Sequence, residues 1–106
     1  YHGGAMSPAV QAASEAAWRD ESHVAENRRR YRDKFAAALP LVQAPLETAM
    51  PDGGFYLWIR TPVDDAEFAR ELYRQYNVSV LPGSYVAREA AGVNPGRNHV
   101  RVALVA

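Results

Sequence analysis

The stretch Pro51–Arg60, PDGGFYLWIR, decides how the rest of the chain is arranged. Its first four residues, PDGG, are a strong turn signal, and the aromatic and apolar residues that follow predict a β-strand. Because side chains alternate along a strand, one face carries Phe55, Leu57 and Ile59 and the other carries Tyr56, Trp58 and Arg60. Both faces are largely apolar, so we expect a central strand that is covered on both sides.

Three further segments complete the predicted sheet. The run His99–Val105 is the only other long segment of β type, and we expect it to pair with the central strand. Leu41–Met50 contains Pro45 and leads into the turn, which favours an extended edge segment and a hairpin. Val78–Leu81 is predicted to be a short strand that Pro82 and Gly83 stop.

Helices are predicted before and between these strands. Ser7 is a helix cap and Pro8 suits a first helical position, so a helix over residues 9–18 should end in a break at residues 19–22, where Ser22 offers a second cap. The apolar spacing of Val24–Leu39 predicts a second helix that Pro40 ends.

A third helix should follow the central strand. Asp64 and Glu67 have the spacing of a capping box, and Asn77 is a good left-handed terminator. The apolar face of this helix is predicted to carry Phe68, Leu72 and Tyr76, broadened by Ala69 and Tyr73. Residues 84–98 should form a loop with a helical turn near residues 85–91.

This order of elements predicts an α+β fold of two layers, with a short, mostly antiparallel sheet packed under helices. A chain of 106 residues suits a single domain, 1–106. It starts at Tyr1 without an initiator methionine and stops at Ala106 close to a strand, so we expect it to be a piece of a longer protein.

Composition argues against several function classes. Twelve basic and twelve acidic residues give a net charge of zero, which disfavours nucleic acid or an anionic membrane as the main partner. The sequence has no cysteine, which fits a cytoplasmic location, and it has no apolar run of membrane-spanning length. The arginine run at residues 28–30, with Arg32 and Lys34, is interleaved with acids and is interpreted as a solvated helix face.

Arg101 is the candidate site residue in the last strand. It lies between Val100 and Val102, and an unpaired guanidinium is costly to bury, so this arginine needs a carboxylate partner. The residues alone favour a half-exposed surface arginine or one that pairs with an internal acid. The functional alternative is that the planar guanidinium of Arg101 binds the carboxylate of a ligand.

Other chemistry finds little support. His2, His23 and His99 match no metal-ligand spacing, and we expect no metal site. Ser84 lies in no nucleophile motif, and Asp64, Asp65 and Glu67 are better explained as helix-start residues than as an acid–base pair.

Several segments in order resemble the C-terminal small domain of the class I/II aminotransferases, which are fold-type-I enzymes that use pyridoxal phosphate. They are GGFYLWIR after the turn, VSVLPGSYV, HVRVAL and the helix ending FAAALP. Within the family, the sequences of Tyr1–Gly4 and Pro82–Leu104 are most similar to those of bacterial succinyldiaminopimelate aminotransferases of lysine biosynthesis. The resemblance implies a homodimer that moves an amino group between N-succinyl-diaminopimelate and 2-oxoglutarate.

The resemblance also assigns roles to residues. Arg101 matches the arginine that binds the substrate α-carboxylate, and Phe55 matches a residue on the substrate side of the site. Tyr1 and His2 lie where the family's chain passes the cofactor of the neighbouring subunit. Arg88 and Arg97 are candidates for a second acid group of the substrate.

The family's chemistry requires a lysine that binds pyridoxal phosphate and an acid on the pyridine nitrogen. The only lysine, Lys34, lies outside any lysine motif of the family, so we expect this chain alone to be inactive and the cofactor to be held by a large domain before Tyr1. A final helix is expected after Ala106.

Two readings compete with the aminotransferase domain. One is a stand-alone α+β ligand-binding or regulatory module. The other is an RNA-binding module that uses Tyr56, Trp58 and Arg60 on an exposed sheet face, which the zero net charge disfavours.

Overall fold

A computed structural model describes residues 4–105 of the chain. The chain divides into two compact units, residues 1–30 and residues 31–106, and the boundary lies inside the second helix. The elements in chain order are α1 (Pro8–Arg19), α2 (Ser22–Gln43), β1 (Glu47–Thr48), β2 (Tyr56–Arg60), α3 (Asp65–Tyr76), β3 (Leu81–Pro82), α4 (Gly83–Val86) and β4 (His99–Ala103).

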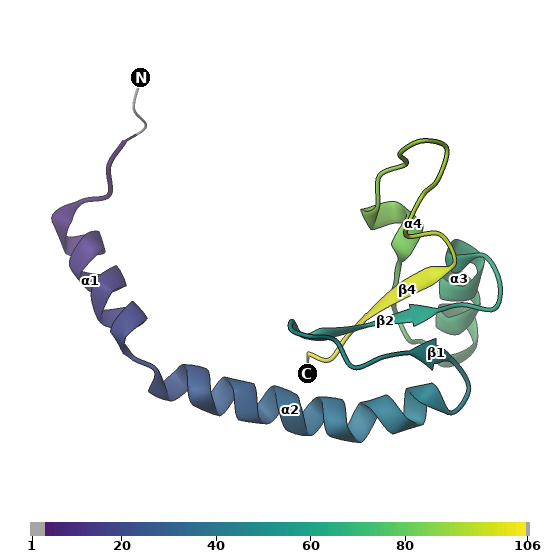
Figure 1. The fold of residues 1–106 in the computed structure, drawn as a ribbon, viewed down its shortest axis with the longest axis horizontal. Coiled ribbons are helices and arrows are strands. Elements are labelled where there is room, and N and C mark those ends of the chain that lie inside the picture. Colours follow the sequence, from purple (N-terminus) through teal and green to yellow (C-terminus); the bar gives the residue numbers. More distant parts are fainter. Residues whose placement is uncertain (1–3, 106) are drawn as a thin grey trace. The chain divides into compact units, whose positions relative to one another are not determined.

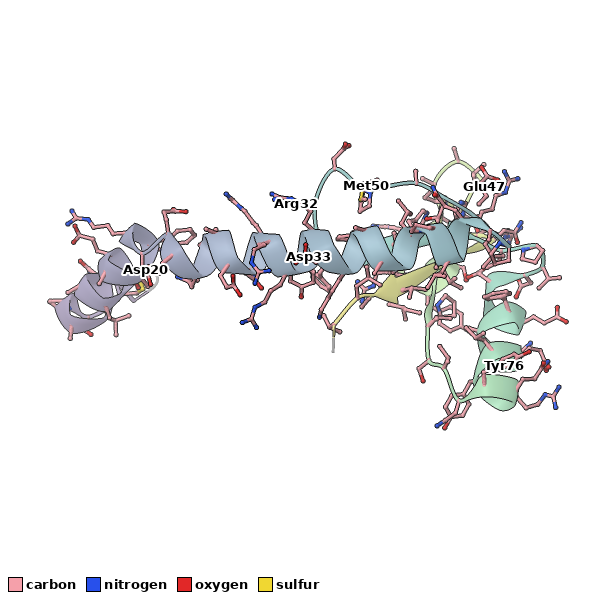
Figure 2. All side chains as sticks on the ribbon, turned by 90° about the horizontal axis from the view of Figure 1, so that it is seen from below. Asp20, Arg32, Asp33, Glu47, Met50 and Tyr76 are labelled. Carbon is pink, nitrogen blue, oxygen red and sulfur yellow. The ribbon has the colours of Figure 1, made fainter. Side chains whose placement is uncertain are left out.

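In the first unit, the predicted helix start and break are confirmed. The hydroxyl of Ser7 accepts a hydrogen bond from the N–H of Val10, and Pro8 takes a first-turn position where its missing N–H costs nothing. The break falls between Arg19 and Ser22, where Asp20, labelled in Figure 2, accepts a hydrogen bond from the N–H of Ser22 at 3.0 Å. The predicted capping role of Ser22 is therefore taken by Asp20.

The helix α2 is longer than the sequence predicts. Pro40 was expected to end it, but Pro40 lies inside the helix, which continues to Gln43. Leu39 and Val42, on either side of this proline, both pack against the core, and this contact favours helix beyond the proline. Arg32 and Asp33 are exposed on α2 (Figure 2), as the interpretation of a solvated face requires.

The second unit contains one four-stranded antiparallel sheet of order β1-β2-β4-β3. Figure 1 labels β1, β2 and β4 of this sheet. The predicted pairing of the central strand with the last strand is confirmed, with Trp58 opposite Arg101 and Leu57 opposite Val102. The hairpin of β1 and β2 is confirmed as well, although β1 is only Glu47–Thr48 rather than the whole of Leu41–Met50.

Helices cover one face of this sheet. The buried core consists of Phe35 from α2 and of Leu57, Ile59 and Val100 from the sheet, and Phe68 of α3 packs against it. The prediction that the central strand is covered on both sides was wrong for the described residues, because Trp58 is 36% exposed. Phe35 of α2 and Phe68 of α3 lie on the same face of the sheet, which gives the predicted α+β fold of two layers.

The ends of α3 follow local signals in the sequence. The carboxylate of Asp64 accepts hydrogen bonds from the N–H groups of Ala66 and Glu67, both at 3.1 Å. Asn77 terminates the helix in the left-handed conformation, with φ of 55°. Tyr76, labelled in Figure 2, is 70% exposed, so the predicted apolar face does not extend to this residue.

The segment that returns the chain from α3 to β4 is shifted from the predicted one. The strand β3 includes Pro82, which an edge strand tolerates because one row of its backbone groups has no strand partner. The helical turn α4 starts at Gly83 rather than near Tyr85. Gly83 and Gly96 are buried with their backbones in close contact, so neither position has room for a Cβ atom.

Candidate functional site

The second face of the sheet, which α2 and α3 leave uncovered, carries the candidate site. We call it the open sheet face. The strand register places on it Glu47 of β1, Tyr56, Trp58 and Arg60 of β2, Leu81 of β3, and His99 and Arg101 of β4.

Arg101 lies in the middle of this face. It is directly opposite Trp58 on one neighbouring strand and Leu81 on the other, and its side chain is partly buried. Its guanidinium carbon is 5.3 Å from the centre of the Tyr56 ring, a cation–π distance. No carboxylate of residues 4–105 forms an ion pair with Arg101. An internal acid partner, one of the alternatives from the sequence, is therefore excluded among these residues.

Tyr56 connects the two residues predicted for the substrate side. Its ring meets the ring of Phe55 edge to face, with the centroids 5.7 Å apart, and its other contact is the guanidinium of Arg101. Phe55 is 43% exposed beside the end of β2. The sequence predicted the correct face for Tyr56 but gave it no role in substrate binding, because a tyrosine next to an apolar strand residue is usual in sheets.

The remaining polar groups of the open sheet face already have partners. His99 stacks on Trp58 with the rings 5.5 Å apart and 11° from parallel, and its Nδ1 lies 2.9 Å from the carbonyl oxygen of Arg97. Arg60 pairs with Glu47 at 3.4 Å. In the part of the sheet that the structure describes, Arg101 is thus the cation that remains available to an anion.

The other predicted site residues are not joined to Arg101. Arg88 and Arg97 are exposed in the segment between α4 and β4, and among residues 4–105 no hydrogen bond or ring contact links either of them to Arg101. Tyr1 and His2, predicted near a cofactor, lie outside the described residues.

Asp65 is a buried residue that the sequence reading treated only as part of a helix start. Its side chain is completely buried, and its carboxylate joins three segments of the chain. One oxygen accepts hydrogen bonds from the N–H (2.9 Å) and the hydroxyl (2.6 Å) of Ser84, and the other accepts from the N–H of Asn98 at 3.1 Å. The neighbouring Asp64 explains the helix start without it, so the sequence held no signal for these bonds across 19 and 33 residues.

The same bonds set the ionisation of Asp65. Burial acts to raise the pKa of this carboxyl, but the hydrogen bonds from Ser84 and Asn98 outweigh burial and hold the pKa below its ordinary value of 3.8. The carboxylate is therefore the form that the fold selects at neutral pH.

We expect the free energy of unfolding to decrease in acid because of Asp65. A group whose pKa is lower in the folded state stabilises the fold above its unfolded pKa of about 3.9, and this contribution is lost as the pH falls through the lower folded pKa. Denaturant titrations from about pH 6 to about pH 2 should show this loss, and Asp65→Asn should flatten the curve below about pH 4.

Glu71 supplies the matched control. Its pKa is also lowered, mainly by hydrogen bonds from Arg74, but the pair is exposed and contributes little to stability. Glu71→Gln should leave most of the acid dependence in place. An unchanged acid slope in Asp65→Asn would contradict the assignment.

Among residues 4–105, the side chains offer no evident site for a cofactor or a metal ion. Lys34, the only lysine of the sequence, donates a hydrogen bond to the carbonyl oxygen of Leu104 at 3.2 Å and lies over the ring of Tyr31, on the helix-covered side of the sheet. Among residues 4–105, no cluster of three histidine or acidic side chains could hold a metal ion. Within the same range, every helix is too short or too polar to cross a bilayer.

An apolar groove of this unit does not include Arg101 in its lining. A space of about 480 Å³ lies along α2 and the end of β4, lined by Ala38, Leu41, Leu104 and their neighbours, with Lys34 as its only charged residue. A groove of this composition offers no set of converging polar groups. The chemistry of the second unit is therefore concentrated at the open sheet face.

Comparison with known proteins identifies relatives along the whole chain. Residues 2–106 match the family described as aminotransferase class I and II. The chain is 37% identical over 107 residues to a probable aminotransferase of Mycobacterium tuberculosis, a match that covers 99% of this chain and 24% of that protein. It also superposes on the crystal structure of an aminotransferase from Neisseria meningitidis Z2491 with a TM-score of 0.92 and 48% identity, over 100% of this chain and 27% of that one. The chain thus spans about a quarter of the length of these relatives.

Proposed function

Because this chain belongs to the class I and II aminotransferase family, we propose that it is the C-terminal small domain of a longer aminotransferase and that it binds the carboxylate of the substrate through Arg101. The proposal covers residues 1–106 as one functional part of that enzyme. The observation that carries it is the guanidinium of Arg101, which is partly buried on the open sheet face and has no acid partner among residues 4–105.

The surroundings of Arg101 suit a carboxylate ligand. A guanidinium presents two parallel N–H groups to the two oxygens of a carboxylate, and this bidentate bond is stronger where water is partly excluded. The ring of Tyr56 limits the movement of the guanidinium on one side, and Phe55 extends this aromatic wall. The role proposed for these residues is to fix the position and the orientation of the substrate.

Members of this family generally use pyridoxal phosphate, which supplies the electron sink for amino-group transfer when it is bound. The residues of this chain do not fit the cofactor by themselves, because Lys34 is engaged with Leu104 on the covered side of the sheet. We therefore propose that the cofactor is held by the remainder of the enzyme and that the isolated chain has no transaminase activity.

The proposed identity of the substrates rests on sequence similarity. The similarity of Pro82–Leu104 to bacterial succinyldiaminopimelate aminotransferases favours N-succinyl-diaminopimelate as amino donor and 2-oxoglutarate as acceptor, in a cytoplasmic homodimer of lysine biosynthesis. Both substrates carry more than one carboxylate. Arg88 and Arg97 remain candidates for the second acid group, although no contact joins them to Arg101.

The test uses the full-length enzyme that contains this chain. The absorbance of its cofactor should change on addition of N-succinyl-diaminopimelate and return on addition of 2-oxoglutarate, whereas alanine, which lacks the succinyl carboxylate, should require a much higher concentration. If the enzyme binds pyridoxal phosphate but responds equally to alanine, the substrate assignment fails while the aminotransferase assignment stands. Tight binding of a dicarboxylate by the isolated chain would instead favour the alternative of a stand-alone ligand-binding module.

A further inference from the structure

We propose that Asp65 is a positioning residue for Arg101, and this inference rests on the proposed function of Arg101 in carboxylate binding. Asp65 forms no hydrogen bond with the described residues of the open sheet face. It acts through two backbone segments next to strands of the sheet. One precedes β4, which carries Arg101, and the other follows β3, which carries Leu81, the residue opposite Arg101.

The first segment begins β4. The N–H of Asn98 donates to Asp65, and the carbonyl oxygen of Asn98 accepts a hydrogen bond from the N–H of Thr61 at 2.8 Å. Asn98 has a positive φ of 58°, a left-handed conformation that asparagine adopts more readily than most other residues. Both backbone groups of Asn98 are thus fixed three residues before Arg101, and the strand starts directly after it.

The second segment follows β3. Ser84 donates both its N–H and its hydroxyl to Asp65, three residues after Leu81, which pairs with Arg101 in the sheet. The carbonyl oxygen of Ser84 accepts a hydrogen bond from the side chain of Asn94 at 3.1 Å, and Asn94 in turn accepts one from the N–H of Gly96 at 2.9 Å. This network connects α4 to the loop that leads into β4.

A single buried carboxylate therefore sets the starting point of one strand and the end of its neighbour. Both anchors are three residues from the pair Leu81 and Arg101, so a loss of the carboxylate should let β4 and β3 shift at the position where the guanidinium projects. Small shifts of a binding group are costly, because a bidentate bond demands a defined position and orientation.

The experiment measures steady-state kinetics of the full-length enzyme for Asp65→Asn, Arg101→Ala and the double variant. Asp65→Asn should raise the KM for the amino acid about tenfold while kcat stays within about threefold of the wild type, because the group it misplaces binds substrate. In the Arg101→Ala background, Asp65→Asn should raise KM no further, since the two residues act as one unit.

Asp64→Asn is the matched control. It removes a carboxylate from the same helix start, but Asp64 is exposed and bonds only to the first turn of α3, so the KM should stay at the wild-type value. If Asp65→Asn does not yield folded enzyme, Ser84→Ala removes one of the three hydrogen bonds and should raise KM about threefold.

The outcomes separate this inference from the proposed function. A wild-type KM in folded Asp65→Asn or Ser84→Ala, together with a raised KM in Arg101→Ala, overturns the positioning role alone. A full additional effect of Asp65→Asn in the Arg101→Ala background overturns it as well and leaves Asp65 with a purely structural role. A wild-type KM in Arg101→Ala overturns the proposed function and the positioning role with it.

Discussion

Arg101→Ala is expected to raise the KM of the full-length enzyme for its amino acid substrate about a hundredfold, with a smaller effect on kcat. Removing one partner of a buried, hydrogen-bonded charge pair costs about 2–5 kcal/mol, much of it because the other charge loses its only partner. The guanidinium lies on the open sheet face with Tyr56 on one side and no acid partner among the described residues. The other arginine of this face, Arg60, already pairs with Glu47, so it does not offer a free cation in place of Arg101. Initial rates over a wide range of substrate concentration measure the effect.

Two variants make this result specific. Arg101→Lys keeps the charge but loses the planar fork, and it should recover only part of the affinity. Arg60→Ala removes another arginine from the same face, but Arg60 is exposed and already pairs with Glu47, so KM should change less than about twofold. If Arg60→Ala and Arg101→Ala have equal effects, the site depends on the overall charge of the face rather than on Arg101.

Gly96→Ala is expected to produce a large loss of stability. A Cβ at residue 96 would overlap the carbonyl group of Gly83, which is backbone and cannot rotate away, and a Cβ at residue 83 would lie 2.8 Å from the carbonyl oxygen of His99. Overpacking of a well-packed site costs about 1–3 kcal/mol and more where backbone must move, so we expect about 3 kcal/mol or more. Thermal unfolding and the yield of folded protein measure the loss.

Gly53→Ala is the control for this substitution. Gly53 has open space around its Cβ position and no positive φ, so the free energy of unfolding should change by less than about 0.5 kcal/mol. If Gly96→Ala and Gly53→Ala are equally stable, the backbones of residues 83 and 96 lie farther apart than in this structure.

Local signals predicted much of this fold. Ser7, Asp64 and Asn77 act within one turn of helix, so the sequence shows their partners directly, and all three adopt the predicted role. Alternation in β2 and β4 predicted the pairing of the two strands, because apolar residues at every second position require a common core.

The predictions were wrong where tertiary contacts, rather than local sequence signals, determine the structure. Pro40 breaks a helix in most contexts, but Leu39 and Val42 pack against the core and continue it. The apolar character of Trp58 suggested a second covering layer, although its ring is used on the open sheet face, where it stacks on His99.

The site was predicted in part. Arg101 stood out because a charge between two valines in a strand needs an explanation, and the structure leaves it without an internal partner among the described residues. Tyr56 and Asp65 were missed for a physical reason. Their roles depend on contacts across 45, 33 and 19 residues, and no spacing rule within the sequence predicts contacts at such distances.

The order of the strands has a consequence for synthesis of the protein. β4 is made after the other strands of the described residues, yet it lies between β2 and β3 in the sheet. Its position beside β2 can be followed in Figure 1. While residues 99–103 are still inside the ribosome, β2 can pair only with the two residues of β1, and its other edge is open. An open edge next to apolar side chains is a site for association with chaperones or with other nascent chains. A ribosome that pauses before His99 should therefore lower the yield of soluble protein more than one that pauses after Ala103.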